Sequence, residues 1–559
     1  MRLVITVLLA FASLQAKSEN IYIDPDCATN GNGSTQNCSD GENGPRNSWV
    51  GITYLPGNAY LGKGGTTANY DSCNFLIKTG GTDAHNQTTL GSYGTGQHSI
   101  VCASGYVFGE TQRSWITIDN LDLTATTGQC IFLQGSNTIT VKNVTFRYCG
   151  AFGIGLGGSN AQVDHDNLTI AQNTFLQTGS SAIAGKPSLS NTQEWANIRI
   201  TGNTFQSGVG SGSDPYAVPA ISLVQVSNQG VGVQNTISNL EIDNNTFLGV
   251  NYSQEFPSFL ILLSRSPFPE DPGPSVDHSN CVRQYSIYGT YIHDNTATDI
   301  GGGIGVHFSV GTSITRNRLT NFRAATVIAL FYSEHMYTGE NVIDEINTGA
   351  FAGYWDGLGI DYDYCTRNGI IAHNYISNAH GSDVANEDWN GQGIAVFAAD
   401  THRIYSNVLV NNRFGVIFGN DNLPKNYGPN HLFNNTIINS QRDGISTRFS
   451  TEQENLIYNN IIAFSQRYGL RADGQGEQRL SNNLFFGNAV SDIISNKTGT
   501  GTLYQDPGLI GGDTVDAFRI LTGSPAYRSG TAVRELYTDF DGQLRPMPPS
   551  IGAFEPVLQ

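Results

Sequence analysis

Asparagine recurs along this chain at intervals of a few tens of residues, and each recurrence opens a short apolar stretch. The series comprises Asn120, Asn143, Asn173, Asn203, Asn245, Asn295, Asn317, Asn341, Asn374, Asn407, Asn435, Asn460 and Asn483. Its shortest interval, between Asn295 and Asn317, is 22 residues, so the longer intervals carry inserted loops. A unit of this length cannot bury an apolar face by itself and has to stack on copies of itself. The period therefore predicts a solenoid.

Most repeats continue with an alternation of glycine and aliphatic residues, as in GIGLGG from Gly153, GIGVHF from Gly303 and GIAVFA from Gly393. An alternation of period two is typical of strands, with Ile and Val on the inner face and the residues between them on the outer face. Asparagine tolerates the left-handed backbone of a sharp corner, and stacked asparagines can hydrogen-bond at the strand spacing of roughly 4.8 Å. We therefore expect the asparagines to form an internal ladder.

These features resemble the right-handed parallel β-helix proteins, the architecture of pectate lyases, polygalacturonases and alginate lyases. The resemblance covers roughly Trp115 to Phe486. It implies an all-β, right-handed parallel β-helix of the pectate-lyase-like superfamily and a carbohydrate-active protein. It does not point to one family, since the adjacent Asp-Asp pair and the Arg-x-Lys of polygalacturonases are absent. A content of 65 glycines and only 14% charged residues agrees with many tight turns and few amphipathic helices.

The N-terminal residues, Met1 and Arg2 followed by an apolar run from Leu3 to Leu14, have the pattern of a secretory signal peptide. No later stretch reaches the ~18 apolar residues that a membrane helix needs. We therefore expect a secreted or periplasmic protein with a signal peptide over residues 1–16. An N-terminal cap with the first rungs is expected over 17–114, the main rungs over 115–491, and a last rung with a capping segment that covers its exposed edge over 492–559.

Eight cysteines in an exported chain allow many pairings, of which the most local are favoured. We expect Cys27 to pair with Cys38, and Cys73 with Cys102. The other four are expected to fill the core instead: Cys130, Cys149, Cys281 and Cys365. No two cysteines have the spacing of a zinc ribbon, and no metal centre is predicted from them.

The chain carries 47 acidic and 29 basic side chains, a formal net charge of −18. Such a charge repels nucleic acids and anionic membranes. We expect neither as a partner, and we expect a monomer whose partner is a polysaccharide. The sequence has no P-loop, no dinucleotide-binding GxGxxG after a strand, no GxSxG elbow and no HExxH motif, so phosphate, nicotinamide, serine-hydrolase and zinc-protease chemistry have no support.

The sharpest chemical signal is the segment WDGLGIDYD, from Trp355 to Asp363. If Leu358 and Ile360 point into the core, strand alternation places Asp361 and Asp363 side by side on the outer face. Two carboxyl groups held that close do not ionise independently, as an acid/base pair requires. We expect the pair to be catalytic. The alternatives are that these carboxylates only solubilise the protein or that they bind calcium.

Other polar residues fall near this pair when the strands are aligned at their apolar positions. His307 lies two rungs before Asp361 in the same outward column, and Arg448 lies three rungs after it. Loops that leave neighbouring rungs add three further candidate catalytic residues, Glu334, His335 and Asp388. The expected substrate-binding residues are Arg448, Arg413, Asp356, Trp355, Trp389 and Tyr252.

These residues leave three functions open. The large number of candidate carboxylates favours a glycoside hydrolase, which needs two carboxyl groups beside the scissile bond. A uronate polysaccharide lyase or epimerase needs a base and, since no lysine occurs between Lys186 and Lys425, it would use His307, His335 or an arginine. A non-catalytic carbohydrate-binding or adhesin-like surface protein is the third alternative, because a fold does not determine a function. No cofactor is expected to be required, calcium being the one candidate ion.

Overall fold

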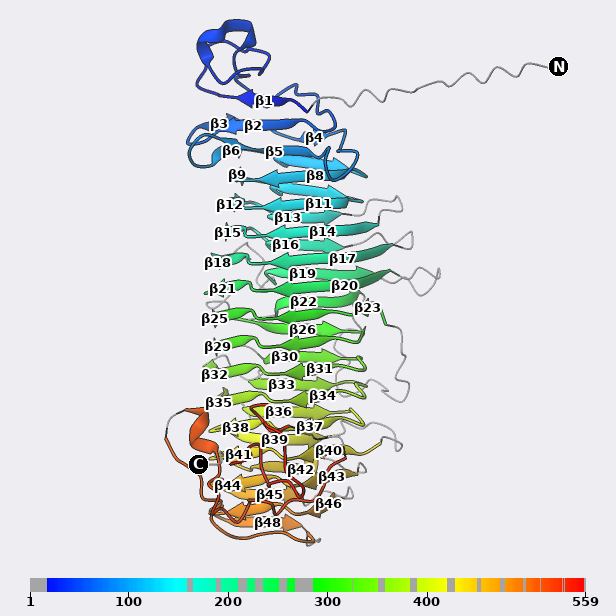
Figure 1. Ribbon diagram of the computed structural model, residues 1–559, viewed down its shortest axis with the longest axis vertical. Coiled ribbons are helices and arrows are strands. Elements are labelled where there is room, and N and C mark those ends of the chain that lie inside the picture. Colours follow the sequence, from blue (N-terminus) through cyan, green and yellow to red (C-terminus); the bar gives the residue numbers. More distant parts are fainter. Residues whose placement is uncertain are drawn as a thin grey trace, which may run out of the picture.

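The protein folds into one long column of stacked strands (Figure 1). The computed structural model describes residues 18–556 apart from 158–163, 187–192, 210–218, 227–234, 251–258, 267–284, 324, 350–356, 383–389, 420–427, 450–453, 473–477, 496–498, 513, 535 and 537. The expected signal peptide thus lies outside the described residues. Three parallel sheets, A, B and C, run along the column, and each turn of the chain adds a strand to A, then B, then C. This is the right-handed parallel β-helix expected from the sequence.

Sheet A comprises β1 (Asn20–Ile23), β2 (Ala59–Lys63), β5 (Thr88–Tyr93), β8 (Ser114–Asp119), β11 (Asn137–Lys142), β14 (His165–Ala171), β17 (Glu194–Thr201), β20 (Thr236–Asp243), β23 (Ile287–Tyr288), β24 (Tyr291–His293), β27 (Ser309–Val310), β28 (Ser313–Thr315), β31 (Tyr337–Gly339), β34 (Ile370–Ala372), β37 (Arg403–Tyr405), β40 (Asn430–Phe433), β43 (Asn455–Tyr458) and β46 (Gln478–Ser481). Sheet B comprises β3 (Thr67–Tyr70), β6 (His98–Cys102), β9 (Leu121–Ala125), β12 (Thr145–Cys149), β15 (Thr174–Gln177), β18 (Thr204–Gly208), β21 (Thr246–Leu248), β25 (Thr296–Ile300), β29 (Arg318–Phe322), β32 (Val342–Gly349), β35 (Tyr375–Ser382), β38 (Val408–Val410), β41 (Thr436–Ile438), β44 (Ile461–Ala463) and β47 (Leu484–Phe486).

Sheet C comprises β4 (Phe75–Ile77), β7 (Phe108–Thr111), β10 (Ile131–Gln134), β13 (Ile154–Gly157), β16 (Ile183–Lys186), β19 (Ile221–Val226), β22 (Phe259–Ser266), β26 (Gly303–His307), β30 (Thr326–Phe331), β33 (Leu358–Asp363), β36 (Gln392–Phe397), β39 (Phe414–Gly419), β42 (Ile445–Phe449), β45 (Tyr468–Ala472) and β48 (Ser491–Ser495). Two short 3-10 helices are also described, η1 (Cys38–Asn43) and η2 (Val515–Phe518). No helix of the described chain is long and apolar enough to cross a membrane.

The interior of the column is filled by side chains from all three sheets, because alternate residues of each strand point inward. In β33, for example, Ile360 and Tyr362 are fully buried in the core. Four phenylalanine rings of sheet B stack on one another from rung to rung, with centroids 4.4, 4.9 and 4.6 Å apart: Phe146, Phe175, Phe205 and Phe247. The continuous core explains how rungs too small to fold alone hold together.

An asparagine ladder runs inside the corner between sheets A and B. It extends from Asn173 to Asn483, and each asparagine donates from its backbone N–H and its side-chain amide to the Oδ1 of the next. The ladder asparagines are buried, and their amides also bond to backbone carbonyls, as Asn173 Nδ2 does to Val141 O (2.9 Å). The predicted internal ladder is confirmed over this range.

The prediction is wrong for Asn120 and Asn143. Both have left-handed backbones (φ 57° and 53°), and the Asn143 amide bonds outside the core to Asp119 (2.8 Å). They occupy the corner position that directly precedes the ladder position, where Asn244 precedes Asn245 with φ 54°. Asparagine suits both positions, since one needs a left-handed backbone and the other needs a buried amide.

The disulfides agree with two predicted pairs and correct the rest. Cys27–Cys38 and Cys73–Cys102 are bonded, as expected. A third bond joins Cys130 to Cys149, and Cys365 is also disulfide-bonded, so the prediction of unbonded core cysteines is wrong for these three. Cys130 and Cys149 are fully buried, but they face each other across the corner between sheets B and C. Cys281 lies outside the described residues.

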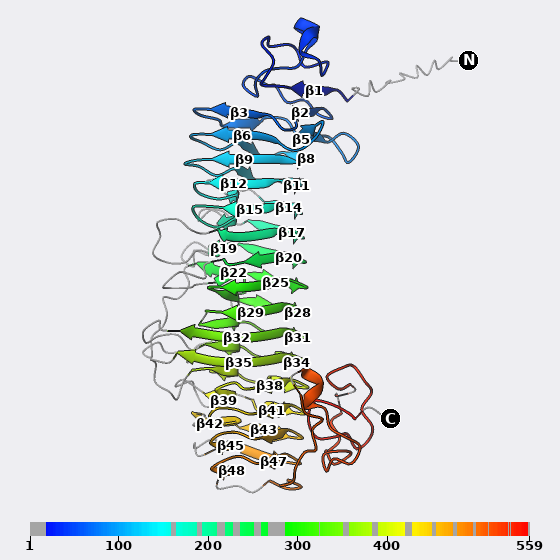
Figure 2. The same ribbon diagram turned by 90° about the vertical axis from the view of Figure 1, so that its left-hand side faces the viewer.

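The C-terminal segment first extends the last rung and then turns back along the column. Thr500 and Leu503 bridge to Ser481 and Leu484 as a partial further rung. The remainder lies against the lower rungs in Figure 2, where it covers the outer face of sheet B. Its apolar residues pack on residues of β38, β41 and β44, and they include Ile520, Ala526, Ile551, Ala553 and Phe554.

Candidate functional site

Two carboxyl side chains project from the outer face of sheet C next to each other. Asp361 and Asp363 alternate with the core residues Ile360 and Tyr362, so both side chains point away from the core, as the alternation predicts. They are nevertheless only 5% and 7% exposed. Asp363 Oδ1 accepts a hydrogen bond from the N–H of Tyr364 (2.6 Å). The pair is therefore held in an enclosed setting on the outside of the helix.

Leu358 does not point into the core, contrary to the sequence-based expectation. Gly359 takes the inward position at this end of β33, where an added Cβ would lie 2.8 Å from the Ile376 side chain. Leu358 belongs instead to a small apolar cluster outside the core, whose other members are Ala395, Phe397, Phe414 and Ile417. Ala395 pairs with Asp361 across β33 and β36, so this outer apolar cluster borders the carboxyl pair.

His307 stands in the column of Asp363 and not in that of Asp361. It pairs with Phe331, which in turn pairs with Asp363. Its ring is 1% exposed, stacks on Phe331 with centroids 4.7 Å apart, and meets the edge of Phe259. Burial lowers the pKa of His307 to about 3, so the imidazole is neutral near pH 7. A ring enclosed in this way does not face a substrate on the surface.

Glu334 and His335 lie on the corner between sheets C and A. Glu334 forms bridges with Val310 and Arg367 in the adjacent rungs. The side chain of His335 is 60% exposed, and its Nε2 lies 3.8 Å from a carboxylate oxygen of Glu334. The two residues thus form an accessible pair beyond the end of the sheet C strands, on a different element from Asp361 and Asp363.

The same corner carries a stack of aromatic rings. Phe308 and Tyr332 are parallel with centroids 4.8 Å apart, and Tyr332 and Tyr364 follow at 6.0 Å. All three residues have left-handed backbones, which turn them out of the strands at the corner. Since Tyr364 directly follows Asp363, the stack borders the carboxyl pair at the end of β33.

Several predicted site residues cannot be placed in this arrangement. Trp355, Asp356, Asp388, Trp389 and Tyr252 lie outside the described residues. The backbone of Arg448 belongs to β42, but its side chain is outside the described part of the chain. The roles expected of these residues stay predictions.

A groove of about 690 Å³ runs along the corner where the chain passes from sheet B to sheet C. It is lined by Asn347, His380, Arg413, Gln441, Arg442, Gln466, Arg467 and Val490. These residues come from successive rungs, so the groove runs parallel to the axis of the column. Only Arg413 among them is predicted from the sequence.

Three arginines form a column along this corner groove. The N–H of Arg442 donates to Arg413 O (2.8 Å) and that of Arg467 to Arg442 O (3.0 Å), which places them one rung apart. Arg413 Nη1 donates to Asn390 Oδ1 (2.6 Å). Arg467 binds the fully buried Asp443 through two hydrogen bonds of 2.6 and 2.7 Å. These contacts hold the guanidinium groups of Arg413 and Arg467.

The groove residues share a sequence signal. An amide residue, an arginine, one further residue and a glycine recur as NRFG from Asn412, QRDG from Gln441 and QRYG from Gln466. Each copy directly precedes or opens a strand of sheet C. The groove also contains one imidazole, that of His380, whose Nδ1 lies 2.6 Å from the Gln441 side-chain nitrogen.

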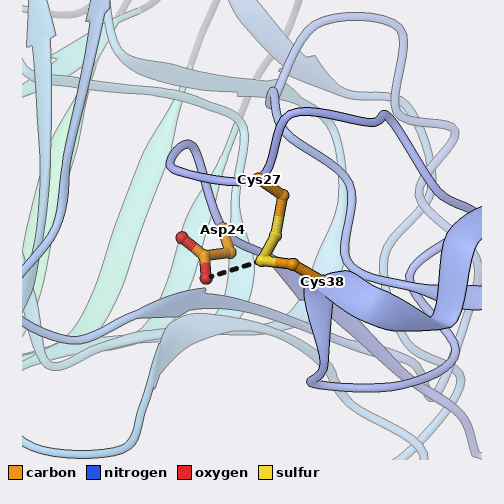
Figure 3. A group of neighbouring side chains, drawn as sticks. All are labelled: Asp24, Cys27 and Cys38. Carbon is orange, nitrogen blue, oxygen red and sulfur yellow. Dashed lines mark hydrogen bonds between the residues drawn. A yellow bond between two sulfur atoms is a disulfide. The ribbon is translucent and has the colours of Figure 1, made fainter.

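Near the N-terminus, three side chains of metal-ligating type come together, those of Asp24, Cys27 and Cys38 (Figure 3). The two sulfur atoms are joined in a disulfide, which removes the thiolates that a metal ion would bind. The carboxylate of Asp24 forms an ion pair with Lys63 Nζ (2.8 Å). We therefore interpret the group as a structural link within the N-terminal segment.

Comparison with known proteins relates this chain to β-helix proteins without assigning it to a family. The model of the family NosD, periplasmic copper-binding protein, matches residues 360–505, about a quarter of the chain. None of the curated proteins matches the chain.

Among solved structures, the chain is similar to a GH136 lacto-N-biosidase from Eubacterium ramulus, with 11% identity, a TM-score of 0.38, and 87% of this chain and 67% of that chain covered. The PL6 family alginate lyase AlyGC matches with 13% identity and a TM-score of 0.44, covering 97% of this chain and 59% of that chain. A mannuronic acid specific polysaccharide family 6 lyase from human gut microbiota has 12% identity and a TM-score of 0.39, with 88% and 92% covered. At these identities the likeness concerns the fold alone.

Proposed function

We propose that the protein is an exported enzyme that hydrolyses a polysaccharide on the outer face of sheet C, with Asp361 and Asp363 as its acid and base groups. The observation that carries the proposal is the placement of these two carboxyl groups next to the outer apolar cluster and to the ring stack of Tyr332 and Tyr364. Sugar sites combine apolar or aromatic surfaces for the ring faces with a few placed polar groups. Glycoside hydrolysis in addition needs two carboxyl groups.

We propose the inverting mode of hydrolysis, in which the two carboxyl groups stand roughly 6.5–9.5 Å apart and leave room for a water molecule. Residues two apart on a strand have backbones roughly 6.6 Å apart, which lets their side chains reach such a separation. In the proposed reaction one carboxylic acid protonates the leaving glycosidic oxygen. The other carboxylate takes a proton from the water that bonds to the anomeric carbon as the glycosidic bond breaks.

Export is part of the proposal. The three disulfides among the described residues support an oxidising compartment, since such bonds are rare in the cytosol. The apolar run from Leu3 to Leu14 supports passage across a membrane by a cleaved signal peptide. A polysaccharide outside the cytoplasm is then the natural substrate.

Substitution of the two acids tests the proposal. Asp361→Asn and Asp363→Asn should each lower the release of reducing ends from the cleaved polysaccharide by about a hundredfold or more, since each removes a proton-transfer group. A panel of neutral and uronic-acid polysaccharides identifies the substrate first. Asp299→Asn, an exposed change on sheet B, is the matched control and should keep full activity. Circular dichroism and thermal unfolding should show that all three variants remain folded.

The products distinguish the alternatives. Reducing ends without ultraviolet absorbance are expected for hydrolysis. An unsaturated, absorbing product would show a lyase and contradict the proposed reaction. Retention of the protein on a polysaccharide without any product would favour a binding protein. Full activity in both folded acid variants would show that Asp361 and Asp363 are not the catalytic pair.

A further inference from the structure

The corner groove has the shape of a site for an extended chain. Its lining begins with Asn347, continues through His380, Arg413 and Arg442, and ends at Val490. These residues stand on successive rungs, so the groove spans roughly 24 Å at about 4.8 Å per rung. The rung spacing is similar to the length of one sugar unit in an extended glycan. Successive sugars would therefore meet successive rungs.

The side chains that line the groove favour a negatively charged ligand. Among the described residues that line the groove, Val490 is the one apolar side chain, and the others offer guanidinium, imidazole and amide groups. A guanidinium has five N–H donors in a planar fork that matches carboxylate or sulfate, so it can bind a ligand while it also bonds to the protein. Charge-assisted bonds of this kind are stronger than neutral ones. The groove is therefore suited to anionic groups.

The arginine column gathers three guanidinium groups at one corner of the β-helix. Arg413, Arg442 and Arg467 stand one rung apart, and like charges at that distance destabilise one another. Asp443 pairs with Arg467 at one end of the column. In a chain with a net charge of −18, three guanidinium groups on successive rungs are a local concentration of cationic side chains. Such a concentration favours contact of an anionic polymer with this corner over the remaining surface.

The corner groove adjoins the outer apolar cluster through Arg467. The guanidinium of Arg467 lies over the ring of Phe414, 5.9 Å from its centroid. Phe414 belongs to the outer apolar cluster, as does Ala395, the strand neighbour of Asp361. A chain bound in the groove thus lies beside the apolar surface that leads to the carboxyl pair.

We infer that the corner groove binds an acidic glycan, whose carboxylate or sulfate groups are held by the arginine column while the chain runs parallel to the axis of the β-helix. The inference rests on the proposed function and adds the chemical class of the substrate. Arg442, in the middle of the column, is the residue whose loss should matter most to the bound anions.

Isothermal titration calorimetry on the Asp361→Asn variant tests the inference without turnover. The probes are hexasaccharides of a uronic acid, of a sulfated sugar and of neutral glucose. We expect the uronic or the sulfated probe to bind and the neutral one not to bind, and the stronger of the two identifies the anionic group. Arg442→Gln should weaken binding about tenfold, the usual weight of a hydrogen bond to a charged group. Arg442→Lys should lose part of this, because it keeps the charge without the fork.

Arg318→Gln is the matched control, since it removes an exposed arginine from sheet B and should leave binding unchanged. Equal binding of neutral and acidic probes, or unchanged binding in a folded Arg442→Gln variant, would overturn the inference. Equally tight binding of single-stranded DNA would also overturn it, because the site would then select charge alone. Failure of the proposed function is seen separately, as cleavage that survives Asp361→Asn or as the absence of any cleavage by the parent protein, whereas failure of the inference is seen in the titrations.

Discussion

His402 is held inside the solenoid as a neutral imidazole. It is fully buried, the Gly369 N–H donates to its Nδ1 (3.0 Å), and its Nε2 lies 3.2 Å from Thr366 Oγ1. Since Nδ1 accepts a hydrogen bond, the ring carries its proton on Nε2. Burial lowers the pKa of His402 from 6.5 to about 3. In the next rung the equivalent position is held by Asn430, whose Oδ1 accepts from the His402 N–H.

This burial predicts an acid sensitivity that one substitution reduces. An unfolded chain binds a proton at His402 below about pH 6.5, whereas the folded chain does not until near pH 3. The contribution of His402 to stability is therefore complete above about pH 6.5 and falls by roughly 1.4 kcal/mol per pH unit below it. His402→Asn should lessen that slope, and urea unfolding between about pH 7 and pH 4 measures it. His85→Asn, at a side chain 97% exposed, should leave the slope unchanged.

The asparagine series shows how much of the fold a residue pattern can predict. The rung period and the internal ladder follow from the spacing of Asn173 to Asn483, and the structure confirms both. Asn120 and Asn143 were predicted as ladder members and lie one position earlier, on the corner itself. The two positions accept asparagine for different physical reasons. The recurrence of asparagine therefore reveals the length of the repeat, but not which of the two positions each asparagine occupies.

At the scale of the element, side-chain directions in the strands of sheet C can be predicted from the sequence more readily than those in the turns before the strands. The outward direction of Asp361 follows from the alternation within β33 alone. The sequence does not predict the arginine column, because the alignment of Arg442 with Arg467 is visible only when the corners of successive rungs are compared. Loops of different length separate the corners, and periodicity along the chain does not display their alignment. The recurring NRFG, QRDG and QRYG would have been the sequence signal.

The C-terminal segment is attached to sheet B through a buried arginine. The side chain of Arg545 is 1% exposed and pairs with Glu555 (3.0 Å). It also donates to Ser406 Oγ at the corner before β38 and to the carbonyl oxygens of Gly552 and Ala553. One side chain thus ties the segment to itself and to the helix.

Arg545→Gln should loosen this element. The change leaves the carboxylate of Glu555 buried without its partner, which costs roughly 3–5 kcal/mol. We expect the C-terminal segment to become sensitive to limited proteolysis, while the rungs before it resist. Arg534→Gln, at an exposed position of the same segment, is the control and should be as resistant as the parent chain. Equal resistance of the Arg545 variant would show that apolar packing alone holds the segment.

At the scale of the whole molecule, each rung of the column contacts mainly the rungs directly above and below it. Each strand pairs with the strands of the rungs directly above and below, and the ladder and the core repeat the same contacts along the axis. In such a solenoid the free energy of unfolding is approximately a sum of terms within rungs and between adjacent rungs. The carboxyl pair and the corner groove occupy rungs from Asn347 onward.

This organisation predicts that a complete rung can be removed. Deletion of residues 295–316 joins Asp294, a left-handed corner residue, to the ladder residue Asn317. Asn245 then meets Asn317 in place of Asn295, and Ile261 and Leu263 meet Ile328 and Leu330, so apolar residues still face apolar residues. We expect a soluble chain with the circular dichroism of a β-helix and cooperative thermal unfolding.

A shorter deletion, of residues 297–316, is the control for that experiment. It leaves two additional residues before Asn317, so the corner and the ladder fall out of phase with the rung above, and the chain should aggregate or unfold at a much lower temperature. Equal behaviour of the two deletions would show that the phase of the asparagine ladder does not govern stacking. Folding of the in-phase deletion alone would show that a left-handed corner followed by a buried asparagine is sufficient to set the register between rungs.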